Sequence, residues 1–212
     1  MTGTNRRPLR SRQSGWAEAA ARRLAAGRVT PNGISMAAVA FAAFGCAMLA
    51  LSAGLGSGPR ALALILAALA CQGRLVCNLL DGMVAVEGGK GAKDGPFWNE
   101  APDRASDILF FAGAGVAAGA VTLGWAAAAL SVLTAYLREL GRAEGLAPDF
   151  SGPMAKQHRM AVLTGAAVLA TAEPWLFDRP VVLQVALWIV VLGAALTAAL
   201  RARRIVLGLK AR

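Results

Sequence analysis

Residues 78–107 read NLLDGMVAVEGGKGAKDGPFWNEAPDRASD, and they place a charged centre inside an otherwise apolar chain. Half of the 12 acidic residues fall in this stretch, namely Asp81, Glu87, Asp94, Glu100, Asp103 and Asp107. The sequence around it is mostly Ala, Leu, Val and Gly. A cluster of carboxylates between apolar helices is costly unless it faces a cation, so we expect the functional site here.

The composition indicates an integral membrane protein. Of the 212 residues, 57% are hydrophobic and only 16% are charged. Apolar runs that begin near Ile34 and Ala61 are long enough to cross a bilayer at about 1.5 Å per residue. Thr30 and Pro31 supply a cap and a helix start just before the first run.

We predict an all-α fold with six transmembrane helices. The predicted order is a span over 34–55, a span from 61 to about 82, a loop at 87–95, two spans within 97–137, a loop at 138–159, a span over 160–172, a turn at 173–180 and a span over 181–200. Residues 108–137 carry no charge and are too long for one span, so we expect a break near Thr122–Gly124. The polar residues around Pro148 and Pro153 predict the loop that precedes a helix starting near Lys156.

The N-terminal 30 residues carry seven Arg, and Trp16, Ala20 and Leu24 recur at four-residue intervals. This pattern predicts an amphipathic helix on the membrane surface, with a basic tail that only fixes orientation as the alternative. The expected organisation is a cytoplasmic basic and amphipathic segment at 1–30, a six-helix transmembrane domain at 31–205 and a cytoplasmic basic tail at 206–212.

The distribution of positive charge predicts the orientation. With both termini on one side, 17 of the 22 Lys and Arg residues lie on that side. The positive-inside tendency makes it the cytoplasmic side, so we expect a multi-pass protein of the cytoplasmic membrane with both termini and the acidic stretch facing the cytoplasm. Orientation accounts for the positive charge, and a nucleic-acid partner is therefore not expected. Cys46, Cys71 and Cys77 lack the spacing of a zinc site or a disulfide framework.

Two helix faces in the acidic stretch carry oxygen-bearing side chains. Helical spacing puts Asn78, Asp81 and Ala85 on one face and Asn99, Asp103 and Asp107 on another. Facing each other, they would form a site for Mg²⁺, Mn²⁺ or Ca²⁺, and Mg²⁺ is commonly shared with the phosphates of a substrate. The alternative is that these carboxylates pair with Arg74, Arg104 and Arg138.

The same stretch resembles the signature of the CDP-alcohol phosphotransferases, integral-membrane enzymes that make phospholipids from CDP-diacylglycerol and related donors. The signature reads Asp-x2-Asp-Gly-x2-Ala-Arg, about eight residues, then Gly-x3-Asp-x3-Asp. Its positions fall on Asn78, Asp81, Gly82, Ala85, Val86, Gly95, Asn99 and Asp103, with Asp107 one turn later. Six spans and the Thr-Pro-Asn start of the first extend the resemblance along most of the chain.

The resemblance implies a reaction in which a phosphatidyl-type group passes from a CDP-linked lipid donor to a small alcohol, with release of CMP. It implies one or two Mg²⁺ or Mn²⁺ ions, bound by Asn78, Asp81, Asn99, Asp103 and Asp107, and donor contacts at Gly82, Ala85 and Gly95. By position Asp103 is also the implied catalytic base. A homodimer is usual in the family.

Basic residues near the cytoplasmic ends of the later spans are candidates for binding the acceptor. Arg138 ends the fourth span, and Lys156 and Arg159 begin the fifth. Each could bind a phosphate or a lipid headgroup, and cytoplasmic anchoring is the alternative.

The chain departs from the signature at three positions. Asn78 and Asn99 replace Asp, which removes two formal charges, and Val86 replaces the Arg that usually contacts the donor. Glu100 or Asp107 could compensate for the missing charge. The departures leave open a second function, a non-catalytic relative that binds a nucleotide lipid or partners another membrane enzyme. A small cation transporter is a third, which metal flux into liposomes would distinguish.

Overall fold

The structure is a computed structural model that describes residues 14–27, 29–86, 88–177 and 181–212. Residues 1–13 of the basic segment, Arg28, Glu87 and Arg179 lie outside the described residues. The elements are α1 (Gly15–Ala26), α2 (Pro31–Ser52), α3 (Ser57–Val86), α4 (Gly95–Ala117), α5 (Val121–Ala143), α6 (Lys156–Leu169), the 3-10 helix η3 (Ala170–Trp175) and α7 (Val181–Lys210).

The described helices confirm an all-α, multi-pass membrane protein. Four of them, α2, α3, α5 and α7, are long and apolar enough to cross a bilayer. By contrast, α4 carries Asp103, Arg104 and Asp107 near its middle, and α6 has 14 residues before the chain tightens into η3. The count of six spans therefore stays a prediction.

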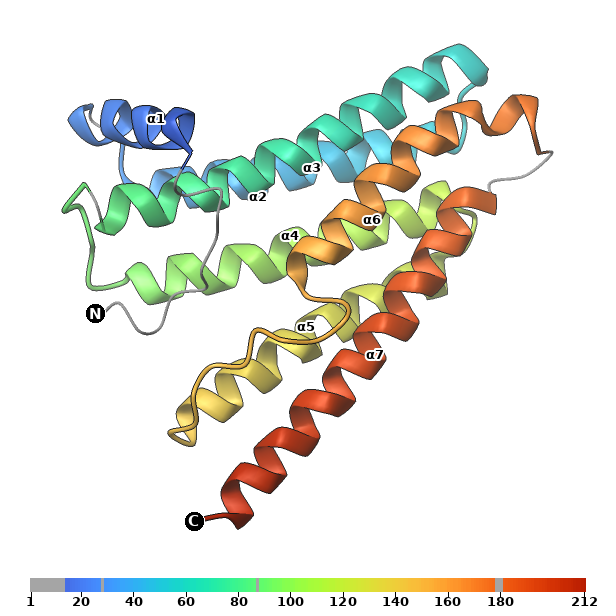
Figure 1. The fold of residues 1–212 in the computed structure, drawn as a ribbon. Coiled ribbons are helices and arrows are strands. Elements are labelled where there is room, and N and C mark those ends of the chain that lie inside the picture. The colour runs from blue at the N-terminus through green and yellow to red at the C-terminus, as the bar shows by residue number, and fades with distance from the viewer. Residues whose placement is uncertain (1–13, 28, 87, 178–180) are drawn as a thin grey trace.

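The helices form one bundle (Figure 1). Helix α2 packs against both α3 and α4, α5 packs against α4 and α7, and α6 packs against α3 and α7. Most of the buried apolar residues are Ala, with larger side chains such as Phe110, Phe111 and Leu187 between them. Small residues let membrane helices approach closely, which suits this core.

The start of α2 is confirmed as predicted. Thr30 is its N-cap, and its Oγ1 accepts a hydrogen bond from the backbone N–H of Gly33 at 3.1 Å. Pro31 occupies the first helical turn, where the backbone N–H that proline lacks would have no partner in the helix.

The predicted break near Thr122–Gly124 was wrong by a few residues. Helix α4 ends at Ala117 and α5 begins at Val121, and Gly119 between them has a left-handed φ of 62°. Gly124 lies inside α5, where an added Cβ would be 2.6 Å from the Cα of Gly115 on α4. The glycine that suggested a break instead permits a close helix crossing.

Two helices run further than their apolar segments. Helix α5 continues to Ala143, so residues 138–143 of the predicted loop are helical, and α7 continues to Lys210. Within α5, Glu139 pairs with both Arg138 and Arg142. Charged side chains that pair along a helix allow it to extend beyond the apolar part.

The C-terminal ends of α3, α5 and α7 and the N-terminal end of α4 lie toward the left side of Figure 1, whereas α6 begins near the middle of the view. Helix α1 packs against α3, burying Ala17 and Ala21 in a small apolar cluster with Leu79 and Met83 of that helix. The amphipathic helix thus forms, and its place on a membrane surface stays a prediction.

Candidate functional site

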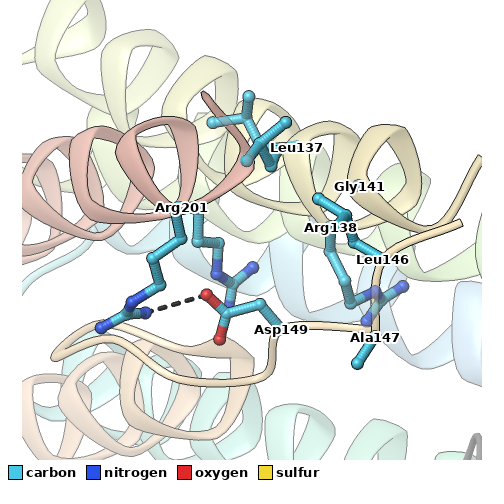
Figure 2. A pocket seen from close by; sticks show the side chains of 9 residues that line it. Leu137, Arg138, Gly141, Leu146, Ala147, Asp149 and Arg201 are labelled. Atoms are coloured by element: carbon cyan, nitrogen blue, oxygen red, sulfur yellow. Dashed lines mark hydrogen bonds and ion pairs between the residues drawn. The ribbon is translucent and has the colours of Figure 1, made fainter. Parts of the chain in front are cut away.

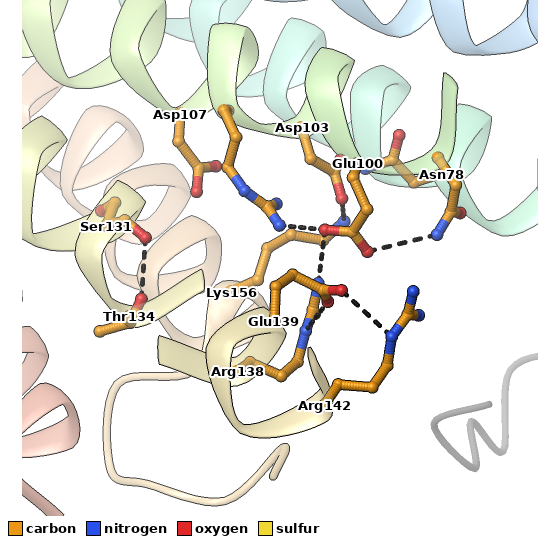
Figure 3. Close-up of polar contacts among 12 residues, drawn as sticks. Asn78, Glu100, Asp103, Asp107, Ser131, Thr134, Arg138, Glu139, Arg142 and Lys156 are labelled. Atoms are coloured by element: carbon orange, nitrogen blue, oxygen red, sulfur yellow. Dashed lines mark hydrogen bonds and ion pairs between the residues drawn. The ribbon is translucent and has the colours of Figure 1, made fainter. Parts of the chain in front are cut away.

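Asn78 and Asp103 join the two helix faces that the sequence singled out. The Nδ2 of Asn78 on α3 donates a hydrogen bond to Oδ1 of Asp103 on α4 at 2.6 Å (Figure 3). Asp81 lies one turn after Asn78, is 7% exposed, and accepts a hydrogen bond from Ser35 of α2 at 2.8 Å. Three helices therefore contribute to the site. The sequence analysis did not identify Ser35, because only the packing of α2 against α3 brings this residue to Asp81.

Asp103 also contacts two cationic side chains from other helices. Its Oδ1 accepts a hydrogen bond from Nη2 of Arg74 at 3.2 Å, and its Oδ2 pairs with the ammonium of Lys156 at the start of α6. The Arg74 side chain is fully buried, whereas the Lys156 side chain is 29% exposed. Each oxygen of Asp103 thus faces a positive charge.

Asp107 lies in a buried ion-pair network next to Asp103. Its Oδ1 accepts from Nη2 of Arg74 at 2.9 Å, and its Oδ2 accepts from Nη2 of Arg159 at 2.8 Å. All three side chains are at most 3% exposed. Arg159 also donates to Oγ1 of Thr134 on α5 at 3.1 Å. Asp103 and Asp107 thus pair with Arg74, which is the alternative that the sequence left open. The network around Asp107 connects four helices.

The remaining oxygen-bearing residues of α4 point elsewhere. Asn99 is exposed, and its Nδ2 lies 3.4 Å from Oε1 of Glu100. Glu100 pairs with both Arg104 and Arg138 (Figure 3). Glu100 is thus already neutralised, and the same holds for Asp107, the other residue expected to replace the missing charge.

The predicted donor positions lie at the end of α3 and the start of α4. Gly82 and Ala85 are half-buried in the last turns of α3, and Gly95 begins α4. The Val86 side chain is exposed. The ammonium of Lys90 donates to the carbonyl of Val29 at 3.3 Å, which ties the connecting loop to the segment between α1 and α2.

A cavity of about 190 Å³ lies between α5, α7 and the loop that follows α5 (Figure 2). Its walls are Leu137, Arg138, Gly141, Leu146, Ala147, Asp149, Arg201, Arg204 and Ile205. Of the three predicted acceptor residues, only Arg138 lines it, because Lys156 and Arg159 are engaged with Asp103 and Asp107.

Arg201 and Arg204 line the cavity, whereas the sequence analysis used them only to predict the orientation of the chain in the membrane. Arg201 donates to the carbonyl of Thr134 at 2.6 Å and to that of Ser151 at 3.1 Å, which holds the loop against α5 and α7. Arg204 pairs with Asp149 at 2.8 Å. Burial raises the pKa of Asp149, but hydrogen bonds from Ser151 and Arg204 outweigh this effect and hold the pKa below its usual value. The position of these arginines directly after the last apolar run was the sequence feature that could have indicated this role.

The signature residues around Asp81 carry oxygen donors of the type that a hard divalent ion prefers. Among the described residues, no group of three or more His, Cys, Asp or Glu side chains is arranged to hold a metal. Asp81, Asp103 and Asn78 carry oxygen atoms, the ligand type that Mg²⁺ and Mn²⁺ prefer, but both oxygens of Asp103 face cations and Asn99 is exposed beside Glu100. Glu100 and Asp107 are paired with arginines and add no unpaired carboxylate to these residues.

The arrangement of the helices is that of a known class of membrane proteins. No family model matches the sequence, and no curated protein matches it either. Among solved structures, the chain is similar to the phosphatidylinositol phosphate synthase of Mycobacterium tuberculosis. The crystal structure of that synthase with CDP-DAG bound has a TM-score of 0.73 and 19% identity, covering 91% of this chain and 94% of that chain.

Two further crystal structures of the same synthase agree. The complex with manganese and citrate has a TM-score of 0.72 and 20% identity, covering 89% of this chain and 88% of that chain. The apo form has a TM-score of 0.69 and 19% identity, covering 87% and 93%. The synthase is a CDP-alcohol phosphotransferase, so this chain has the overall fold of a known member of the family that the signature resembles.

Proposed function

We propose that this chain is a membrane transferase that moves a phosphatidyl-type group from a CDP-linked lipid such as CDP-diacylglycerol to an alcohol and releases CMP. The observation that carries the proposal is the contact between Asn78 and Asp103, which joins the two halves of the signature on the fold of a synthase solved with CDP-DAG bound. Asp81, Gly82, Ala85, Gly95 and Asp103 keep the signature residues at their spacing.

In the proposed mechanism Asp103 is the general base. Its carboxylate removes the proton of the acceptor hydroxyl, whose oxygen then attacks the lipid-linked phosphorus. The new P–O bond forms as the bond to CMP breaks, and CMP leaves with the bridging oxygen. Arg74 and Asn78 hold the orientation of Asp103 during this step. Gly82, which has no side chain, lets the donor approach the backbone of α3.

Asp81 and Asp103, with Asn78 and Asn99, would hold one Mg²⁺ or Mn²⁺ ion in this proposal. The support is their donor chemistry together with the manganese complex of the structural neighbour. A divalent ion at such a site supplies charge neutralisation at the pyrophosphate and at the leaving CMP.

The cavity beside α5 and α7 favours a phosphorylated alcohol as the acceptor. Arg138, Arg201 and Arg204 put three positive charges in its wall, against one negative charge from Asp149. Guanidinium groups bind phosphate through charge-assisted hydrogen bonds. Glycerol 3-phosphate and inositol phosphate are therefore expected to be better acceptors than serine.

The test is CMP release by the purified protein. Protein in lipid nanodiscs is given CDP-diacylglycerol, MnCl₂ and each alcohol in turn. Asp103→Asn should abolish CMP release, whereas Asp94→Asn, at an exposed carboxylate that accepts hydrogen bonds from Asn32 and Trp98, should retain it. Absence of CMP with every acceptor, from protein that unfolds cooperatively on heating, would refute the proposal.

One observation favours a non-catalytic relative as a second candidate. Asn78 donates its amide hydrogen to Asp103, where the signature has a carboxylate that could bind metal. Restoring Asp at positions 78 and 99 separates the two functions. If CMP release occurs only in the double variant, the natural chain binds a nucleotide lipid or a membrane partner without turning it over.

The orientation and the assembly state are part of the same proposal. We infer that both chain termini and the site face the cytoplasm, and that the protein forms a homodimer as is usual for the resembled family. Labelling of single cysteines introduced near Lys93 and Lys210 in intact cells tests the orientation, since only a membrane-permeant reagent should react. Mass measurement in nanodiscs tests the dimer.

A further inference from the structure

The charged groups around Asp103 already cancel within the chain. Asp103 and Asp107 form one network of ion pairs with Arg74, Lys156 and Arg159. A third carboxylate, Asp81, lies beside this network, one helical turn after the Asn78 that donates to Asp103. The formal charges of this cluster of three carboxylates and three cations sum to zero. A divalent ion that enters alone must therefore replace a positive group that is already in place, or leave the cluster with two excess positive charges.

Lys156 is the member of this cluster that can leave. Its side chain is 29% exposed, whereas those of Arg74 and Arg159 are 0% and 3% exposed. Asp107 holds both Arg74 and Arg159, whereas among the described residues the Lys156 ammonium bonds to Asp103 alone. A lysine ammonium on a flexible stem exchanges partners more readily than a buried guanidinium.

A pyrophosphate supplies the missing negative charge. It offers oxygen ligands to a divalent ion and an anionic partner to Lys156 at the same time. If Lys156 turns to the pyrophosphate, Oδ2 of Asp103 becomes available to the ion. The ion and the pyrophosphate then increase each other's affinity. Either ligand alone would bind to a neutral cluster whose charges are already paired.

We propose that this protein binds its divalent ion together with the pyrophosphate of its donor, and that Lys156 sets this order by occupying Asp103 until the donor arrives. The inference rests on the proposed function for the identity of the ligand. It assigns Lys156 to the donor side of the reaction, as a positioning residue for Asp103. No covalent step is added to the reaction.

The experiment measures Mn²⁺ binding by titration calorimetry and electron paramagnetic resonance, with purified protein in nanodiscs and CDP as the pyrophosphate probe. Saturating CDP should raise the affinity for Mn²⁺ about tenfold or more, and Mn²⁺ should raise the affinity for CDP by the same factor, after correction for the Mn–CDP complex in solution. In Lys156→Gln, the affinity for Mn²⁺ alone should rise about tenfold and the coupling to CDP should shrink correspondingly.

Two variants serve as controls. Lys156→Arg keeps the positive charge and should retain the wild-type coupling. Lys210→Gln removes a lysine at the end of α7 and should bind Mn²⁺ and CDP as the wild type does. Thermal unfolding establishes that each variant is folded before its binding is compared.

The inference fails if Mn²⁺ binds equally well with and without CDP, or if Lys156→Gln leaves the affinity for Mn²⁺ unchanged. This failure differs from failure of the proposed function, because the binding measurement needs no turnover. CMP release without coupling would overturn the inference and leave the function in place. Coupling without CMP release would support the inference and favour the non-catalytic relative.

Discussion

Asp107→Asn is expected to be the most destabilising single change in the site. The carboxylate is 1% exposed and accepts hydrogen bonds from Arg74 at 2.9 Å and from Arg159 at 2.8 Å. Asn keeps the size of the side chain but removes its charge. Arg74 would retain its contact to Asp103 at 3.2 Å, but Arg159 would keep only neutral oxygen partners, among them Oγ1 of Thr134.

The loss can be bounded from the burial of these groups. Removing one member of a buried ion pair costs about 3–5 kcal/mol, because the remaining charge stays buried without compensation. For a chain of this size, 1 kcal/mol corresponds to about 2–4 °C in the unfolding midpoint. Asp107→Asn should therefore lower the midpoint by roughly 6–20 °C.

The assay is thermal unfolding in detergent, followed by tryptophan fluorescence, once with EDTA and once with Mn²⁺. The loss should be the same in both, because the contacts of Asp107 are to arginines. Adding Arg159→Met should recover part of it, since that change removes one unpaired charge, whereas Asp94→Asn should shift stability by less than about 1 kcal/mol. A loss below about 1 kcal/mol for Asp107→Asn would refute this reasoning. A loss seen only with Mn²⁺ would also refute it and would make Asp107 a metal ligand.

Three further changes test the rest of the bundle by the same unfolding assay. Gly124→Ala should lower the free energy of unfolding by about 1–3 kcal/mol, because its Cβ would lie 2.6 Å from the backbone of α4, whereas Gly165→Ala, which meets open space, should have little effect. Glu173→Gln should cost about 1–3 kcal/mol by weakening the bond from Arg60 at 2.5 Å, and Mn²⁺ binding should not change because this pair lies at the opposite end of the bundle (Figure 1). Asp149→Asn should cost less than about 1 kcal/mol at neutral pH. The pKa of Asp149 is lower in the folded than in the unfolded chain, where it is about 4. Its contribution to stability is therefore complete above the unfolded pKa and is lost as the pH falls through the folded pKa. The stabilities of variant and wild type should converge only at that more acidic pH.

Local patterns in the sequence predicted the fold and the location of the candidate site. The Thr30 cap, the long apolar runs and the helical spacing of Asn78 and Asp103 depend on residues a few positions apart, and all three appear in the structure. Such features can be predicted from sequence because helix starts and helix faces are determined by neighbouring residues. The resemblance to the signature then added a reaction to the two faces.

The partners of the charged groups could not be predicted in the same way. Ser35 and Asp81 are 46 positions apart, and Asp103 and Lys156 are 53 apart. Which of them meet depends on the rotation and crossing of packed helices, and a one-residue change in helix rotation would turn Lys156 away. The sequence therefore identified Lys156 as a basic residue near the site, and the structure alone identified its partner.

Arg74 makes the stability of the bundle and the state of the candidate site depend on each other. A single nitrogen, Nη2, donates to Asp103 and to Asp107, while Nε and Nη1 are buried without a hydrogen-bond partner among the described residues. A buried guanidinium with unused donors is costly, and stability alone gives no reason to retain it. Its effect on Asp103 supplies one, because a fixed positive charge favours the ionised carboxylate that a general base requires. A ligand that draws Asp103 away would leave Arg74 to Asp107 alone, and so the buried network resists any movement of the base from its place between α3 and α4.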